Sequence, residues 1–133
     1  MKKFLIFGII IIGCINFIYY KYYKTGKFNL LLERYPNSKF TQTIEIVLGV
    51  VCDMLGKSDS AIFRFNRAIN IYTLEESKPF SYYNIAKIYE EKKEIKLALK
   101  YYRLTFEKYP KSYYGDLSRK RYDYLLLLGY KEK

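Results

Sequence analysis

The chain has 133 residues, half of them apolar and a fifth aromatic, which gives room for one folded domain behind a leader. Its lack of histidine, with Cys52 as the one cysteine outside the leader, excludes an intrachain disulfide in the folded part and argues against a zinc site. The net charge of +11 divides into +5 for residues 1–27 and +6 for residues 28–133, where both signs are mixed, so it argues against a nucleic-acid footprint.

Residues 1–26 are predicted to be a membrane anchor or signal segment with a juxtamembrane collar. From Phe4 to Tyr20 the only strongly polar residue is Asn16, and a helix of this length would reach roughly 26 Å, the short end of a membrane span. Tyrosines and lysines follow, as in the aromatic and basic collar that lies at lipid headgroups. The favoured prediction is a single-pass N-terminal anchor that contacts membrane lipid through residues 4–24.

A signal peptide is the alternative for the same leader. Lys2 and Lys3 would form its charged region, and residues 4–13 its apolar region. The residues at 11–14 resemble the bacterial lipobox, which implies lipidation of Cys14, although the polar tether usual in lipoproteins does not follow. A retained helix, a lipoprotein and simple cleavage all stay open. Because the leader resembles a signal sequence, we expect the domain on the periplasmic or extracytoplasmic side, although the flanking lysines are nearly balanced.

Residues 27–133 contain a spacing that occurs twice. Small residues stand twelve positions apart in two windows, from Gly49 to Ala61 and from Ala86 to Ala98. In each window an aromatic follows four positions later and a small residue seven positions later; these are Phe65 and Ala68, then Tyr102 and Thr105. Small side chains at such positions let two antiparallel helices approach closely. The spacing therefore predicts two helical hairpins.

The second window resembles the tetratricopeptide repeat, whose pattern has a 34-residue period. Tyr82 stands in the place of its tryptophan, Tyr89 follows, and Pro110 closes the segment. The first window departs from the pattern at Glu45, where an aromatic is usual, and at Thr73, where proline is usual. The distance from the first to the second window is 37 residues, so about three residues are inserted within residues 73–79.

The resemblance implies an all-α fold, a short tetratricopeptide-like solenoid of helical hairpins behind the N-terminal apolar helix. Its parts in chain order are a lone helix at 27–36, a repeat at 42–75, a repeat at 79–112 and a capping helix at 113–128, about two and a half repeats plus the cap. The motifs "YPNS" and "YPKS" separate helices, so Ser38 and Ser112 are predicted to cap the next ones. The cap is expected to cover the second repeat with Leu117, Tyr124, Leu125 and Leu128.

The resemblance also implies that the first helix of each hairpin lines a groove for a partner segment. Carried over by position, the predicted lining residues are Ile46, Val50, Asp53, Phe80, Tyr83, Asn84, Lys87, Leu117, Arg121 and Tyr124, with Thr43 and Glu90 beside them. An aromatic groove with two cations would suit a peptide with hydrophobic anchors and an acidic residue or terminal carboxylate. The alternative is that individual members of this set only pack against neighbouring helices.

The sequence predicts no enzyme and no cofactor. It has no glycine-rich phosphate loop and no histidine that could activate Cys52. Glu90, Glu91 and Glu94 are interspersed with lysines, as on a solvated turn.

The predicted function is that of a membrane-anchored adaptor or scaffold that binds a protein or peptide partner. Short leader-anchored chains with such repeats resemble subunits of bacterial envelope complexes for outer-membrane assembly, cell-wall coordination or flagella. Because the array is short, its open apolar edge is expected to bind another protein or a second copy. One alternative is a basic, tyrosine-rich binder of membrane surfaces or nucleic acid, whose affinity would fall steeply with salt. The other is a purely structural subunit of a larger assembly.

Overall fold

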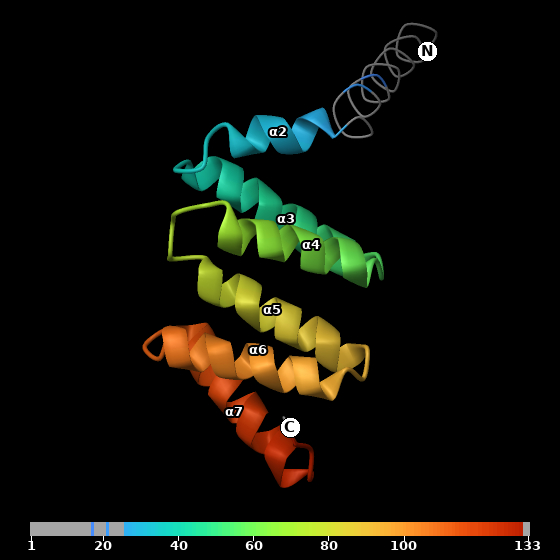
Figure 1. The fold of residues 1–133 in the computed structure, drawn as a ribbon, viewed down its shortest axis with the longest axis vertical. Helices are drawn as coiled ribbons and strands as arrows, with labels where there is room; N and C mark the ends of the chain where they lie inside the picture. Colours follow the sequence, from blue (N-terminus) through green and yellow to red (C-terminus); the bar gives the residue numbers. More distant parts are fainter. Residues whose placement is uncertain (1–16, 18–20, 22–25, 132–133) are drawn as a thin grey trace, which may run out of the picture. The chain divides into compact units, whose positions relative to one another are not determined.

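The computed structural model describes Phe17, Lys21 and residues 26–131 of the chain. Residues 26–131 form six α-helices, labelled α2 to α7 in Figure 1, and no β-strand. The chain divides into two compact units, residues 1–35 and residues 36–133. Helix α2 (Lys27–Glu33) belongs to the first unit and lies within the predicted lone helix. The other five helices belong to the second unit.

Most of the predicted leader, including Cys14 and the N-terminal apolar helix, lies outside the described residues. Among the helices that the structure does describe, none combines the length and the hydropathy that crossing a membrane requires. The retained anchor and the lipidated cysteine therefore both stay predictions.

The second unit consists of two helical hairpins followed by one more helix (Figure 1). In the first hairpin α3 (Lys39–Met54) packs against α4 (Ser58–Asn70), and in the second α5 (Lys78–Glu91) packs against α6 (Ile95–Lys108). Contacts between α4 and α5 join the hairpins, and α7 (Tyr113–Leu127) packs on α6 and α5. This arrangement is consistent with the predicted tetratricopeptide-like solenoid.

The repeated small residues lie where the helices pack most closely. Ala61, Ala86 and Ala98 are fully buried. A β-carbon on Gly49 would lie 2.8 Å from Cε1 of the fully buried Phe65, so the close contact between α3 and α4 depends on a missing side chain. The prediction that these positions serve close helix packing is confirmed.

Two hydrophobic clusters hold the second unit together. Both clusters join neighbouring elements rather than the two helices of one hairpin alone, as expected for a solenoid whose core runs through the stack. The first consists of Ala61, Phe65, Ile69, Ile85 and Ile88, from α4 and α5. The second consists of Ala86, Ala98, Leu99, Tyr102 and Leu125, from α5, α6 and α7.

The helix ends follow local rules that the sequence indicates. Ser38 Oγ accepts a hydrogen bond from Thr41 N at 3.4 Å, and Ser112 Oγ accepts one from Gly115 N at 2.9 Å. Both serines therefore cap the helices that follow them, as predicted.

Helix α7 covers the second hairpin with a different face from the one predicted. Leu125 is buried and Leu117 half-buried, but the predicted contacts Tyr124 and Leu128 are 48% and 56% exposed. The buried positions of α7 are Gly115, Ser118 and Leu125. The predicted stripe was wrong at two positions because the packed face runs through Tyr114, Ser118, Tyr122 and Leu125, which stand three or four residues apart and turn Tyr124 and Leu128 toward solvent.

Candidate functional site

A continuous row of aromatic rings runs from α4 through α5 to α6 and α7. Ring contacts at such separations are favourable, so the row holds the start of α5 against its neighbours. Two of the rings, Phe80 and Tyr83, belong to the predicted groove. The centroid distances are 6.1 Å for Phe65–Phe80, 5.1 Å for Phe80–Tyr114, 5.6 Å for Tyr83–Tyr114 and 5.9 Å for Tyr83–Tyr102.

A pocket of about 370 Å³ opens beside this row, and we name it the α5–α7 pocket. It is lined by Tyr83, Lys87, Glu90, Glu91, Lys93, Tyr102 and Arg121. The structure thus brings three of the predicted groove residues together in one hollow: Tyr83 and Lys87 from α5, and Arg121 from α7.

Arg121 and Glu90 form an ion pair across the α5–α7 pocket. Arg121 Nε lies 3.0 Å from Glu90 Oε2, and its Nη2 donates to Oε1. The Tyr102 hydroxyl also donates to Oε2, at 2.9 Å. Burial raises the pKa of Glu90, but the hydrogen bonds from Arg121 and Tyr102 outweigh it and hold that pKa below its ordinary value of 4.5. The guanidinium of Arg121 lies 5.0 Å from the ring centroid of the exposed Tyr124, which keeps this predicted residue at the rim.

Lys87 is paired with its carboxylates at longer distances than Arg121 is paired with Glu90. Its Nζ lies 3.6 Å from Asp53 Oδ2 on α3 and 3.4 Å from Glu91 Oε1, and its side chain is 44% exposed. Burial opposes its charge, but Glu91 and Asp53 raise the pKa of Lys87 above its ordinary value of 10.5. The ammonium is therefore charged at neutral pH, and an acidic group on a partner would compete with two weakly held carboxylates for it.

The other predicted groove residues make structural contacts. Ile46, Val50 and Phe80 pack against the first hydrophobic cluster. Asn84 Nδ2 donates to the carbonyl oxygen of Phe80 at 2.8 Å, within its own helix, and Leu117 is half-buried on α7. The structure therefore brings Tyr83, Lys87 and Arg121 together in the α5–α7 pocket and places most of the other predicted residues in contacts within or between helices.

Sequence reasoning missed the role of Glu45, which it noted only as a departure from the repeat pattern. Glu45 is fully buried, and its carboxylate accepts hydrogen bonds from Arg64 Nη1 at 3.0 Å and Arg67 Nε at 2.8 Å. The Tyr72 hydroxyl lies 3.4 Å from the same carboxylate, and burial together with Glu45 raises the pKa of Tyr72 to about 12. Two arginines spaced three residues apart on the facing helix were the available signal.

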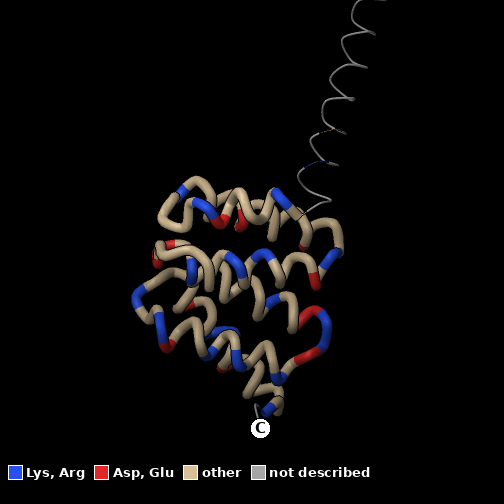
Figure 2. Tube along the Cα trace, turned by 45° about the horizontal axis from the view of Figure 1, so that its top comes forward, with Lys and Arg blue, Asp and Glu red and all other residues tan. Residues whose placement is uncertain are grey.

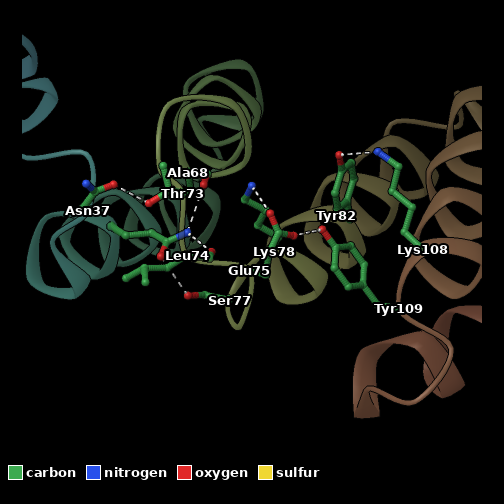
Figure 3. A network of polar contacts seen from close by, with 11 residues as sticks. Asn37, Ala68, Thr73, Leu74, Glu75, Ser77, Lys78, Tyr82, Lys108 and Tyr109 are labelled. Carbon is green, nitrogen blue, oxygen red and sulfur yellow. Dashed lines mark hydrogen bonds and ion pairs between the residues drawn. The ribbon is translucent and has the colours of Figure 1, made fainter.

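A second missed network ties the segment between the hairpins to α3 and α4 (Figure 3). The buried Gln42 uses its Nε2 to donate to the carbonyl oxygens of Ala68 at 3.2 Å and Leu74 at 2.9 Å. Thr73 Oγ1 donates to Asn37 Oδ1 at 2.6 Å. The inserted segment is therefore held in place by specific hydrogen bonds.

Charged residues of both signs occur along the helices of the second unit (Figure 2). The largest positive excess lies on α6, where four basic residues stand with one acidic residue, Glu107. Over the part of the chain that the structure describes, no group of three or more histidine, cysteine, aspartate or glutamate residues could hold a metal ion.

Comparison with known families bears on the hairpin that carries the α5–α7 pocket. Residues 80–112, from the first turn of α5 to the capping serine of α7, match the model of the tetratricopeptide repeat family. This part of the chain is tetratricopeptide-like. A search of curated proteins and a search of solved structures each found no match. Repeats of this kind present extended surfaces for partners, so the match supports a role in protein–protein interaction.

Proposed function

We propose that this chain is a membrane-anchored adaptor whose tetratricopeptide-like unit binds a segment of a partner protein at the α5–α7 pocket. The observation that carries the proposal is the combination, in the hairpin that matches the family, of the partly exposed Tyr83 ring with the half-exposed ammonium group of Lys87 at one pocket. Binding surfaces rely on such aromatic anchors, and a nearby charge selects the partner.

The chemistry of the α5–α7 pocket indicates the kind of segment it would bind. Tyr83, which is partly exposed, offers its ring to an apolar or aromatic side chain, and the buried Tyr102 supports that ring from behind at a centroid distance of 5.9 Å. Lys87 offers a charge to an acidic side chain or a terminal carboxylate, because its own carboxylate partners lie at 3.4 and 3.6 Å and are loosely held. Arg121 is less available, since Glu90 and the ring of Tyr124 already engage it.

The membrane part of the proposal rests on the leader sequence. We place the folded unit on the extracytoplasmic side, in a bacterial envelope complex for outer-membrane assembly, cell-wall coordination or flagella. Helix α3 and the residue that follows it support the idea that the unit works inside a complex, because they expose five large apolar side chains. These are Phe40, Val47, Val51, Met54 and Leu55, which are between 44% and 81% exposed.

Intact mass of the protein purified from its own membranes tests the anchor. A mass near that of the full chain, 16.0 kDa, is expected for a retained helix. A mass that lacks residues 1–13 and carries acyl chains on Cys14 would instead establish a lipoprotein. A mass that lacks the whole leader and carries no lipid would contradict membrane anchoring.

Site-specific photocrosslinking tests the binding site. A photoreactive residue replaces Tyr124, at the rim of the α5–α7 pocket, and in a matched control it replaces Lys100, which is exposed on α6. After irradiation in the native membrane, we expect one recurrent protein partner from position 124 and none from position 100. The same partner from both positions, or no partner from position 124 in a folded protein, would contradict the proposal.

A charge reversal in the same background sharpens the test. Lys87→Glu should lower the yield of the crosslink from position 124 about tenfold, the factor that corresponds to about 1.4 kcal/mol of binding free energy. Lys96→Glu, an exposed lysine on α6, is the control for the change in net charge and should leave the yield unchanged.

A further inference from the structure

A second pocket, of about 510 Å³, lies at the junction of the two hairpins and shares no lining residue with the α5–α7 pocket. We name it the junction pocket. It is formed by the end of α4, the segment between the hairpins, the start of α5 and the end of α6. Its polar lining residues are Asn70, Glu75, Lys78, Tyr82, Lys108 and Tyr109.

Glu75 enters the junction pocket from the segment between the hairpins (Figure 3). Its Oε1 lies 2.6 Å from Lys78 Nζ, and its Oε2 accepts a hydrogen bond from the Tyr109 hydroxyl at 2.7 Å. Both oxygens of one carboxylate are thus held by donors from two different helices. The hydrogen bonds from Lys78 and Tyr109, with a smaller contribution from the charge of Lys108, hold the pKa of Glu75 below its ordinary value of 4.5.

Lys108 also lines the junction pocket, but it contacts a tyrosine and not Glu75. Its Nζ lies 3.3 Å from the Tyr82 hydroxyl and 5.3 Å from the centroid of the same ring (Figure 3). Within residues 26–131 it forms no ion pair with a carboxylate. The junction pocket therefore contains two neighbouring features. One is the position between Lys78 and Tyr109 where a carboxylate is bound, and the other is the Lys108 ammonium group beside the Tyr82 ring.

The Glu75 carboxylate is held weakly enough that another carboxylate could displace it. Its side chain is 64% exposed, whereas that of its partner Lys78 is only 14% exposed. An ion pair with so exposed a carboxylate stabilises the fold little, because water competes for it. Lys78 and Tyr109, by contrast, are positioned by helices α5 and α6 and would stay in place if Glu75 left.

We propose that the junction pocket is a second binding site, for an acidic side chain of a partner peptide, and that Glu75 is its internal occupant. The carboxylate of the partner takes the position of the Glu75 carboxylate, between Lys78 and Tyr109, and also faces Lys108. An apolar or aromatic neighbour in the peptide packs against the ring of Tyr82. Glu75 then turns to solvent, so the intact chain binds such a segment only in competition with its own loop.

The test compares two single substitutions in the same loop of the full chain, kept in mild detergent. Glu75→Gln removes the internal occupant. Glu76→Gln makes the same change of charge at a side chain that lies outside the pocket and pairs with Lys39 at 3.0 Å. The probe is an acetylated and amidated peptide with the sequence of residues 73–77, TLEES, titrated by NMR.

We expect Glu75→Gln to bind the peptide about three- to fivefold more tightly than the wild type and Glu76→Gln, because a tethered competitor has been removed. The largest changes in NMR chemical shift should occur at residues 78, 82, 108 and 109. Equal affinities for the two variants, or shifts confined to the α5–α7 pocket, would overturn the proposal. The proposal would also be overturned if a peptide in which glutamine replaces both glutamates bound as tightly as TLEES. The same holds if inorganic phosphate caused the same chemical-shift changes as TLEES.

Two further variants distinguish binding at the junction pocket from binding at the α5–α7 pocket, on which the proposed function rests. Lys108→Gln in the Glu75→Gln background should lose about the same factor of three to five, since a charge facing the carboxylate is removed. Lys87→Glu, which disturbs the α5–α7 pocket, should leave binding of the TLEES peptide unchanged. No loss with Lys108→Gln in a folded protein would overturn the proposal.

Discussion

Glu45 Oε1 accepts a hydrogen bond from Arg67 Nε at 2.8 Å in a place where the repeat pattern has an aromatic ring. The carboxylate is fully buried, and Arg64 Nη1 reaches its other oxygen at 3.0 Å. Both guanidinium groups also lie within 5.7 Å of the ring centroid of Phe63. Helices α3 and α4 are therefore joined by a buried charged cluster in addition to apolar packing.

Glu45→Ala should lower the free energy of unfolding by about 3–5 kcal/mol, because it leaves two nearly buried guanidinium groups without their carboxylate. Urea unfolding followed by circular dichroism measures the loss. The control is Glu76→Ala, which breaks an exposed ion pair with Lys39 and should cost about 0–1 kcal/mol. If the two variants lost similar amounts, the buried cluster would contribute no more than a surface pair.

Gly115→Ala should destabilise the second unit although alanine favours a helix. A β-carbon at residue 115 would lie 2.0 Å from the carbonyl oxygen of Tyr109, a backbone atom that no rotamer change can move. We expect a net loss of about 1–3 kcal/mol in thermal unfolding, the usual cost of overpacking. Asp123→Ala, an exposed substitution on the same helix, should change stability by about 0.5 kcal/mol or less. A Gly115→Ala protein as stable as the wild type would show that α7 can move away without cost.

The turns that follow α3 and α5 offer a matched pair of substitutions. Gly56 and Lys93, 37 residues apart, have φ values of 68° and 64°, a conformation that costs a residue with a side chain about 1 kcal/mol. Lys93→Gly should therefore raise stability by about 0.5–1 kcal/mol, and Gly56→Ala should lower it by a similar amount. A β-carbon on Gly56 meets nothing within 4 Å, so backbone strain alone is measured there. Changes in the same direction in chemical denaturation would contradict this account.

Glu90 should make the stability of the second unit depend on acid pH. Its pKa is held below the ordinary value of 4.5, so the unfolded chain binds its proton first as the pH falls. The stabilising contribution is fully present above pH 4.5 and is lost as the pH falls through the folded pKa. Glu90→Gln removes that contribution at neutral pH.

Urea unfolding of both proteins between about pH 7 and pH 3 tests this prediction. The difference in the free energy of unfolding between wild type and Glu90→Gln should become smaller as the pH falls. If the difference in unfolding free energy between the two proteins stayed constant with pH, the ion pair with Arg121 would contribute no pH-dependent stability.

The sequence by itself determined that two helical hairpins form and that serines cap two of the helices. Gly49 and Ala61 predicted a close contact between two helices because only small side chains permit it, and the clash that a β-carbon on Gly49 would make with Phe65 confirms that reason. The serines after the "YP" motifs were predicted to cap helices from local chemistry, and Ser112 does so at 2.9 Å. The caps depend on neighbours within one turn, and the helix contact shows itself as a spacing that occurs twice, so both are visible in the sequence.

Only the tertiary structure decided which polar groups meet. Glu45 was visible in the sequence as an exception, but its partners lie on another helix, 19 and 22 residues away. Glu75 reaches Tyr109 across 34 residues, and Arg121 reaches Glu90 across 31. The rotation of each helix about its axis and the path of the inserted segment bring these groups together, and small differences in packing set both. That is why the repeat could be predicted from spacing, whereas the α5–α7 pocket and the junction pocket required the folded chain.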